Sequence, residues 1–277
     1  MNLPAEDYRC YRHPDREAYI TCQRCERFIC PECMNEASVG FQCPECIVKG
    51  AKTVRQPKTL AGGSISGREG RVSMILIGIN VAAYIAQIAT GDGSGEVFQQ
   101  GALQGFAVAD GDYWRLVTSA FLHGSVLHLL FNMYALYLFG PFVERALGTT
   151  RFVAAYLTAA VAGSVAAYVL TGPSTATIGA SGAVFGLFAL ALLFLLRAKQ
   201  DVRSLLVLLA INAFISVAGA NISWQGHLGG FVAGAVLGAA FAYAPRERKT
   251  LVQVLVFTGL WVVMIAAIVV RTLDLTP

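Results

Sequence analysis

Charged residues are scarce in this chain, and long stretches contain almost none. Only 14% of its 277 residues are Asp, Glu, Lys or Arg, and 56% are hydrophobic; soluble proteins average about 25% and about 45–50%. The deficit begins at Val72, after which charges fall in short clusters between apolar runs. This pattern excludes an ordinary soluble enzyme and predicts a membrane protein. The net charge of +4 comes from loops and does not indicate a nucleic-acid partner.

An apolar run is also missing from the start of the chain. The first such run begins at Val72, so the sequence contains no recognisable secretory signal peptide. Residues 1–71 are polar and hold all seven cysteines. We therefore expect a small cytoplasmic domain, followed by a part that is embedded in the membrane.

Seven apolar stretches follow, each close to the length of about 20 residues that crosses a bilayer as a helix. None of them contains Asp or Glu, and the fourth is short. The predicted ranges are 72–90, a span within 116–143, 152–171, 181–196, 202–218, 224–244 and 251–270.

Basic residues mark alternate connections between these spans. Lys and Arg gather before the first span and again near residues 145–151, 197–203 and 246–249. Because basic loops stay in the cytoplasm, we predict a multi-pass protein of the cell membrane with a cytoplasmic N-terminus and an extracytoplasmic C-terminus. Residues 49–71, rich in glycine and basic side chains, are expected to form a flexible linker that either lies near anionic headgroups or is a plain solvated tether.

The cysteines and one histidine form four pairs, and a gap of two residues separates the members of each pair. This gap lets both side chains reach one tetrahedral ion, so eight ligands suit two structural zinc ions. Disulfides are disfavoured in the reducing cytoplasm. A domain this small needs a cross-link in order to fold, and a bound metal ion can provide one. The pairs are Cys10 and His13, Cys22 and Cys25, Cys30 and Cys33, and Cys43 and Cys46.

Residues 10–46 resemble a B-box-like zinc finger, although Cys43 and Cys46 stand where such fingers usually have histidines. The resemblance implies interleaved pairing, whereas spacing alone leaves sequential pairing open. One ion would bind Cys10, His13, Cys30 and Cys33, and the other Cys22, Cys25, Cys43 and Cys46. The domain could also bind a cytoplasmic protein partner, although no particular residue indicates one.

Four polar side chains in the predicted spans fall at one depth. Polar and ionisable groups in a bilayer are costly and are therefore functional candidates. His128 and Asn132 lie four residues apart on one face of the second span, Ser181 opens the fourth, and His227 is near the start of the sixth. These three spans run in the same direction, so we expect the four side chains to lie together beneath the outer surface.

These residue types suit acyl transfer. A serine hydroxyl becomes a good nucleophile when a base removes its proton, and His227 is a suitable base for Ser181. His128, Asn132 and the main-chain N–H of Ser181 could donate hydrogen bonds to the resulting oxyanion. Without a carboxylate to orient the base, the sequence predicts a Ser-His dyad that needs no cofactor for catalysis. Phe185 is placed to pack on the imidazole of His227.

Over about residues 72–244, the chain resembles the rhomboid family of intramembrane serine proteases. The matching motifs are G-A-S-G at 179–182, His128-x3-Asn132, His227-x2-Gly230-x3-Gly234, Tyr113-Trp114-Arg115 and Glu144-Arg145-x2-Gly148. The resemblance implies single-pass transmembrane proteins as substrates, cleaved near the outer face of the bilayer. It also implies access between the second and fifth helices, and residues 219–223 are a candidate cap.

The resemblance also assigns roles to individual residues. Ser181 would be the nucleophile, His227 the base, and His128 and Asn132 the oxyanion donors. His123, Gly179 and Phe185 would support them. Phe185 stands where relatives often have Tyr, and the loss of that hydroxyl is not expected to inactivate the enzyme.

We therefore expect an all-α polytopic membrane protein preceded by a small zinc-binding domain. Its predicted parts are the zinc domain at 1–48, the linker at 49–71, a rhomboid-like six-helix core at 72–244 and one additional transmembrane helix within 245–277. The alternatives are an inactive relative that binds transmembrane segments, a transporter, and a scaffold organised by the zinc domain. The presence of both Ser181 and His227 argues against the first, and the lack of internal repeats argues against the second.

Overall fold

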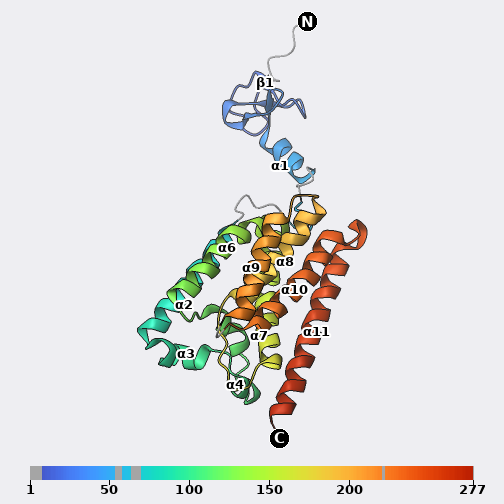
Figure 1. The fold of residues 1–277 in the computed structure, drawn as a ribbon. Coiled ribbons are helices and arrows are strands. Elements are labelled where there is room, and N and C mark those ends of the chain that lie inside the picture. Colours follow the sequence, from blue (N-terminus) through green and yellow to red (C-terminus); the bar gives the residue numbers. More distant parts are fainter. Residues whose placement is uncertain (1–7, 54–57, 64–69, 220–221, 277) are drawn as a thin grey trace. The chain divides into compact units, whose positions relative to one another are not determined.

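The computed structural model describes residues 8–53, 58–63, 70–219 and 222–276. These divide into two compact units, residues 1–57 and 58–277, and Figure 1 shows the elements of each. The larger unit is a bundle of helices, whereas the smaller unit contains short strands and one helix.

The N-terminal unit has little regular structure. Strand β1 (Ile20–Thr21) pairs antiparallel with β2 (Phe28–Ile29), and β3 (Asn35–Glu36) pairs with β4 (Phe41–Gln42). A 3-10 turn, η1 (Pro31–Cys33), lies between the two hairpins, and helix α1 (Pro44–Thr53) ends the unit. Its buried interior consists mainly of cysteine side chains. So few other apolar groups cannot stabilise a fold of this size without a further cross-link.

Seven long helices form the second unit, within the residues that the structure describes. Five of them are long and apolar enough to cross a membrane, and the other two, α8 and α9, are shorter apolar helices. The expectation of an all-α polytopic fold is confirmed. The helices are α2 (Arg71–Ala89), α6 (Val126–Leu147), α7 (Thr149–Leu170), α8 (Ser181–Arg197), α9 (Arg203–Ala218), α10 (Trp224–Tyr243) and α11 (Lys249–Leu275).

The second predicted span differs from helix α6 at its C-terminal end. Ser125 caps the helix by accepting a hydrogen bond from the main-chain N–H of His128. The helix then continues past residue 143 to Leu147, and so includes Glu144 and Arg145. Residues 92–121, which precede it, form short segments: η2 (Asp92–Ser94), α3 (Glu96–Gly101), α4 (Gly105–Ala109), α5 (Arg115–Thr118) and η3 (Ser119–Phe121).

Helices α7, α8 and α10 pack on one another at the centre of this unit. Helices α8 and α10 are closest at two glycines, because a methyl group on Gly230 would overlap the carbonyl oxygen of Gly182, and one on Gly234 would overlap that of Gly186. Small residues at such a crossing let two backbones approach closely in a membrane. This crossing fixes the position of Ser181 relative to α10.

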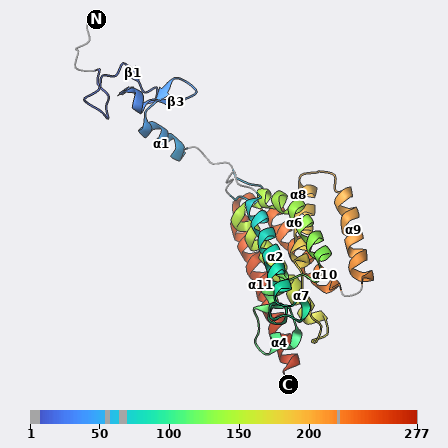
Figure 2. The same ribbon diagram turned by 90° about the vertical axis from the view of Figure 1, so that its left-hand side faces the viewer.

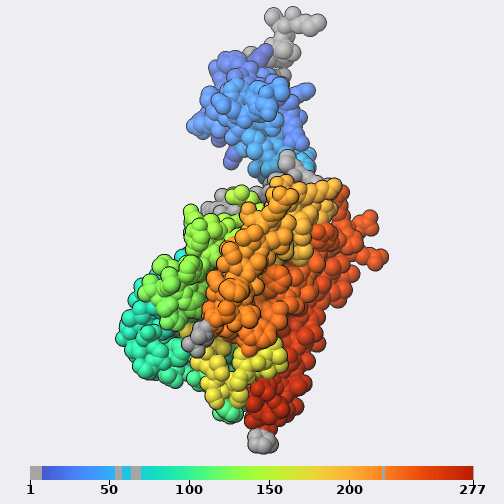
Figure 3. All heavy atoms as spheres, in the orientation of Figure 1, coloured from blue at the N-terminus to red at the C-terminus, as the bar shows by residue number. Residues whose placement is uncertain are grey.

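Helix α9 lies at one edge of the bundle, as Figure 2 shows, and Figure 3 shows its outer surface exposed. Only Leu205 and Ser216 of this helix are buried. The connection to α10 contains the predicted cap at 219–223, of which residues 220–221 lie outside the described part of the chain. Helix α9 is therefore the long helix with the fewest buried side chains besides α11, whose buried residues are Gln253 and Met264.

The linker expected over 49–71 includes described segments with defined contacts, whereas residues 54–57 and 64–69 lie outside the described part of the chain. Residues 49–53 belong to α1, and residues 58–63 pack on the helical bundle. The main chain of Ala61 donates to the carbonyl of Ala146 and accepts a hydrogen bond from Gln253, at 3.1 and 3.0 Å. Ala61 is fully buried. The 3-10 turn η4 (Arg246–Arg248) precedes α11 at the same end of the bundle.

Candidate active site and metal-binding groups

Ser181 and His227 meet across the α8–α10 crossing. The Oγ atom of Ser181 lies 2.8 Å from Nε2 of His227, within hydrogen-bond distance. Ser181 is the first residue of α8, and His227 is in the first turn of α10. Both side chains therefore lie at the same end of the bundle, and glycine contacts that begin within one turn of them hold the two helices together.

Phe185 supports the imidazole from one side. Its ring stacks on that of His227, with centroids 4.3 Å apart and planes inclined by 11°. Phe185 is buried on α8, one turn after Ser181. The stacking restrains rotation of the imidazole, so that Nε2 stays directed at the serine.

His128 lies over the backbone just before the serine. Gly179 has a φ of +126°, a conformation that favours glycine. A methyl group at this position would lie 2.8 Å from Nε2 of His128. The main-chain N–H of Gly124 points at Nδ1 of the same ring, 3.4 Å away. An acceptor role for Nδ1 leaves the proton on Nε2, which is the nitrogen that lies against Gly179.

Asn132 is buried one turn beyond His128 on α6. One hydrogen of its side-chain amide is donated to the carbonyl of His128, at 3.0 Å. The second hydrogen is left for another acceptor, because a primary amide has two N–H groups. Asn132 thus supports the helix turn that carries His128, and it retains one free donor.

His123 is fully buried beside His128, and the two rings meet edge to face with centroids 5.1 Å apart. Gln87, from α2, holds its main chain: the amide nitrogen donates to the His123 carbonyl at 2.8 Å, and the amide oxygen accepts from the His123 N–H at 3.1 Å. Helix α2 therefore positions the segment that leads into α6.

The remaining motif residues have structural contacts. Arg115 is buried and donates to the carbonyls of Gln99 and Ala102 at 2.7 and 2.9 Å, which holds the connection before α6 together. Glu144 is buried at the opposite end of the bundle. It accepts hydrogen bonds from the main-chain N–H of Ser73 at 3.1 Å and from its hydroxyl at 2.9 Å. A carboxylate there satisfies free N–H groups at the start of α2.

The sequence analysis missed Ser216, which lies beside the dyad. Its hydroxyl lies 2.6 Å from Nδ1 of His227, on the side of the ring opposite Ser181. Gln87 was missed as well. A sequence signal existed for Ser216, because Asn212 and Ser216 are polar residues at helical spacing within an apolar span.

The cysteines and His13 form two groups in the N-terminal unit. In each group the candidate ligand atoms lie within 4.8 Å of one another. One group contains Cys10, His13, Cys30 and Cys33, and the other contains Cys22, Cys25, Cys43 and Cys46. The grouping is interleaved, as the zinc-finger resemblance implied, and not sequential.

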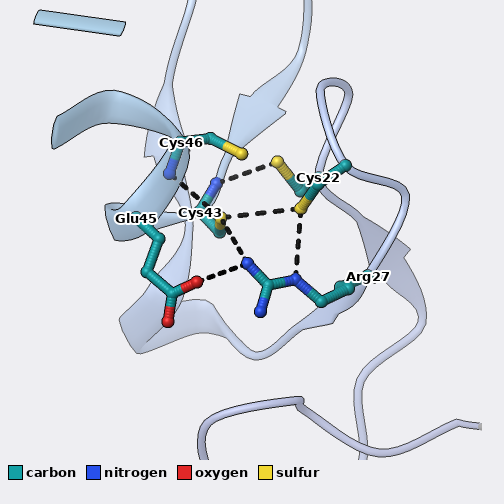
Figure 4. A network of polar contacts seen from close by, with 6 residues as sticks. Cys22, Arg27, Cys43, Glu45 and Cys46 are labelled. Carbon is teal, nitrogen blue, oxygen red and sulfur yellow. Dashed lines mark hydrogen bonds and ion pairs between the residues drawn. The ribbon is translucent and has the colours of Figure 1, made fainter. Parts of the chain in front are cut away.

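The second group has a cationic neighbour, shown in Figure 4. The guanidinium of Arg27 donates to Cys25 Sγ at 3.3 Å and pairs with Glu45 at 2.5 Å. The main-chain N–H of Cys43 points at Cys22 Sγ at 3.2 Å, and that of Cys46 at Cys43 Sγ at 3.4 Å. Such donors stabilise thiolates, which are the form of cysteine that binds metal.

The donor set of both groups suits a metal ion. Burial, together with hydrogen bonds to Cys10 and Cys30, raises the pKa of the Cys33 thiol to about 12. The three sulfurs of the first group and the four of the second cannot all ionise beside one another without a cation to offset their charge. The sulfurs of Cys25 and Cys43 are 3.7 Å apart, close to the edge of a tetrahedron with metal–sulfur bonds of about 2.3 Å.

Comparison with known proteins agrees with the geometry of the helical unit. The family model described as "Rhomboid domain" matches residues 110–244. "Putative rhomboid protease YdcA" of Bacillus subtilis is 36% identical over 147 residues, which cover 51% of this chain and 73% of that protein. "Rhomboid protease GluP" of the same organism is 39% identical over 145 residues.

The extent of these matches differs. The match to GluP covers 50% of this chain but only 28% of that protein. "RHOMBOID-like protein 5" of Arabidopsis thaliana is 30% identical over 154 residues, which cover 53% of this chain and 50% of that protein. Since the match to YdcA covers nearly three quarters of that protein, the relationship extends well beyond single motifs. This chain is therefore a member of the rhomboid family of intramembrane serine proteases.

Proposed function

We propose that the chain is an endopeptidase that cleaves transmembrane segments near the outer face of the membrane through a Ser181–His227 dyad. The observation that carries the proposal is the distance of 2.8 Å between Ser181 Oγ and His227 Nε2. A nucleophile within hydrogen-bond distance of a base is the arrangement that serine acyl transfer requires.

In the first step, His227 Nε2 takes the proton of the Ser181 hydroxyl while Oγ attacks the carbonyl carbon of the scissile peptide. The imidazolium then gives this proton to the leaving amine, and an acyl-enzyme remains on Ser181. Water, deprotonated by the same imidazole, attacks the ester and releases the second product, which restores the hydroxyl.

The tetrahedral intermediates carry a negative charge on oxygen. Two kinds of N–H group face this position: Nε2–H of His128, which lies against Gly179, and the main-chain N–H groups at the start of α8, which have no partner within the helix. The free amide hydrogen of Asn132 is a third candidate. Loss of one such donor typically lowers the rate by about 10²–10³.

The basic connections support the orientation of the site. Arg145 and Arg246 lie at the end of the bundle opposite Ser181, and cytoplasmic ends are the basic ones. We therefore place the dyad toward the outer face, the N-terminus in the cytoplasm and the C-terminus outside, in the cell membrane. Substrates would be single-pass transmembrane proteins that unwind locally there, because a helix engages its own carbonyls in hydrogen bonds.

Substrate access is proposed between α6 and α9. Helix α9 buries only two side chains, so its displacement breaks few contacts. Cysteines introduced at facing positions of α6 and α9 should, once oxidised, block cleavage of a transmembrane substrate, and reduction should restore it. Full cleavage by the cross-linked protein would exclude this route.

The N-terminal groups are proposed to bind two structural zinc ions. Thiolate and imidazole ligands in a tetrahedral arrangement are typical of zinc, and four protein ligands leave no position for catalysis. The folded unit could then bind a cytoplasmic protein partner. Removing residues 1–57 tests the role of this unit. Loss of cleavage in detergent would show that the unit supports the protease itself, whereas loss only in cells would show that it recruits a partner.

Cleavage by the purified protein tests the proposed activity. The wild-type chain in detergent should cut a generic transmembrane substrate, and Ser181→Ala and His227→Ala should not. Ser164→Ala is a control, because it removes a different buried hydroxyl, whose partner is Ser119 and not His227. Undiminished cleavage by Ser181→Ala would refute the proposal.

A further inference from the structure

Ser216 connects the imidazole of His227 to helix α9. Its Oγ atom lies 2.6 Å from Nδ1 of His227 and 2.6 Å from the carbonyl oxygen of Asn212, one turn earlier in the same helix. Ser216 is one of the two buried residues of α9, with 5% of its surface exposed. A buried hydroxyl at this distance from both groups forms hydrogen bonds with both.

The chemistry of the three groups sets the direction of these bonds. A carbonyl can only accept, so the hydroxyl hydrogen of Ser216 is donated to Asn212. The hydroxyl oxygen is then free to accept, and Nδ1 of His227 must carry the hydrogen that it accepts. A neutral imidazole with a hydrogen on Nδ1 has a lone pair on Nε2, and this lone pair faces the hydroxyl of Ser181.

We propose that Ser216 is a positioning residue for the reaction, which fixes His227 in the tautomer that can act as a base. The inference builds on the proposed dyad of Ser181 and His227. Ser216 occupies the position relative to the imidazole that a carboxylate occupies in a catalytic triad, but it adds no charge. A neutral acceptor suits a site within the membrane, where a buried carboxylate would be costly.

The surroundings of the hydrogen bond are apolar. Ser216 and His227 are in the wall of a pocket of about 370 Å³ between α9 and the α8–α10 pair. The other lining side chains are apolar: Phe185, Leu209, Ala210, Ala213, Val217, Trp224, Leu228 and Phe231. Ser216 therefore supplies the hydroxyl in this lining that can accept a hydrogen bond from Nδ1 of His227, and it decides which ring nitrogen carries the proton.

The location of Ser216 has a mechanical consequence. The other groups that orient His227 are on α8 and α10, which are fixed by their close crossing, whereas Ser216 is on the sparsely packed α9. An outward displacement of α9 therefore separates Ser216 from His227 while Ser181 and Phe185 stay in place. His227 is therefore held in the tautomer that can act as a base only when α9 is packed against the bundle.

A matched pair of substitutions tests the role of the hydroxyl. Ser216→Thr keeps the hydroxyl and adds a methyl group beside the pocket, and Ser216→Val has nearly the same shape without the hydroxyl. We expect Ser216→Val to lower kcat, and the rate at which a fluorophosphonate labels Ser181, by about 10- to 100-fold, within the range of general-base effects. Its KM should change by less than about threefold, and Ser216→Thr should stay within about threefold of wild type.

Controls distinguish this inference from the dyad itself. Ser181→Ala and His227→Ala should lose labelling completely, and their failure to do so would refute the dyad and with it the role of Ser216. If both are inactive but Ser216→Val is labelled at the wild-type rate, the dyad stands and the role of Ser216 is refuted. Ser164→Ala controls for the loss of a buried hydroxyl elsewhere.

A spectroscopic measurement on the wild-type protein tests the inference directly. The chain contains four histidines, so nitrogen-15 NMR of histidine-labelled protein can assign each ring. In the wild type, His227 should be protonated at Nδ1 and unprotonated at Nε2. In Ser216→Val, the signal should shift toward a mixture of tautomers. A wild-type His227 with its proton on Nε2 would overturn the inference.

Discussion

Gly230 of α10 lies against the carbonyl group of Gly182 of α8, so closely that no side chain fits between the two backbones. Each glycine is within one turn of a proposed catalytic residue, His227 or Ser181. The approach of the two backbones therefore sets the distance between base and nucleophile. Substitutions at this crossing should affect catalysis through geometry, without a change in any reacting group.

Gly230→Ala should accordingly lower both activity and stability. The added methyl group meets main-chain atoms of Gly182, which cannot rotate away, and overpacking of this kind typically costs about 1–3 kcal/mol. We expect a lower temperature of unfolding in detergent and a large loss of substrate cleavage. Gly78→Ala on α2 is the control, because no atom outside the backbone of that helix turn lies within 4 Å of the added methyl group; equal effects of the two substitutions would contradict this account.

Replacing Glu144 should destabilise the bundle at the end away from the dyad. Its carboxylate accepts the N–H groups of Val72 and Ser73 and the hydroxyl of Ser73. Glu144→Leu leaves these donors without an acceptor, at a cost of about 1–3 kcal/mol for each buried unsatisfied group. The temperature of unfolding should be clearly lower for Glu144→Leu than for wild type. The decrease should be smaller for Glu144→Gln, which keeps one acceptor oxygen. Identical unfolding temperatures of both variants and wild type would show that this cap is unimportant.

Gln87 should matter for activity although it is remote from the dyad. Its side chain makes two hydrogen bonds with the main chain of His123, whose ring contacts His128. Gln87→Leu has a similar size but makes neither bond, so the segment that leads to His128 loses its anchor. We predict a decrease of kcat of about tenfold or more, consistent with a disturbed oxyanion donor, while fluorophosphonate labelling remains detectable. Wild-type turnover in this variant would exclude a role for Gln87 in positioning His128.

Metal removal should affect the N-terminal unit selectively. Elemental analysis should find about two zinc ions per chain, and Cys43→Ser should remove one of them. A strong chelator should unfold residues 8–53, detected as rapid cleavage by an added protease, because metal binding supplies most of the folding free energy of such a domain. Ser181 should still be labelled after chelation. Protection from the protease without metal would contradict a structural role for the ions.

The sequence predicted the helical architecture because apolar runs and basic connections are strong local signals. The positions of the ligands in the N-terminal unit were also predictable, because the spacing of cysteine pairs reflects the geometry of one tetrahedral ion. The proposed dyad was predictable for a different reason. Ser181 and His227 are isolated polar groups at equal depth, and a bilayer makes such groups conspicuous.

Other features depend on long-range contacts that have no local signal. Gln87 and His123 are far apart in the sequence, and either could have been a solvated loop residue. Residues 58–63 were predicted to belong to a linker. Their glycines and polar side chains do not indicate that Ala61 is buried against Gln253. The role of Ser216 was not predictable for another reason. Serine is common in transmembrane helices as a packing residue, so its presence alone does not indicate a contact with a catalytic group.

The most direct test of the central claim is to identify the residue that becomes covalently modified. Wild-type protein in detergent is treated with a fluorophosphonate and digested, and the adduct is located by mass spectrometry. The account predicts one adduct, on Ser181, which is absent from His227→Ala although that variant remains folded. An adduct on another serine, or equal labelling of Ser181 without His227, would contradict it.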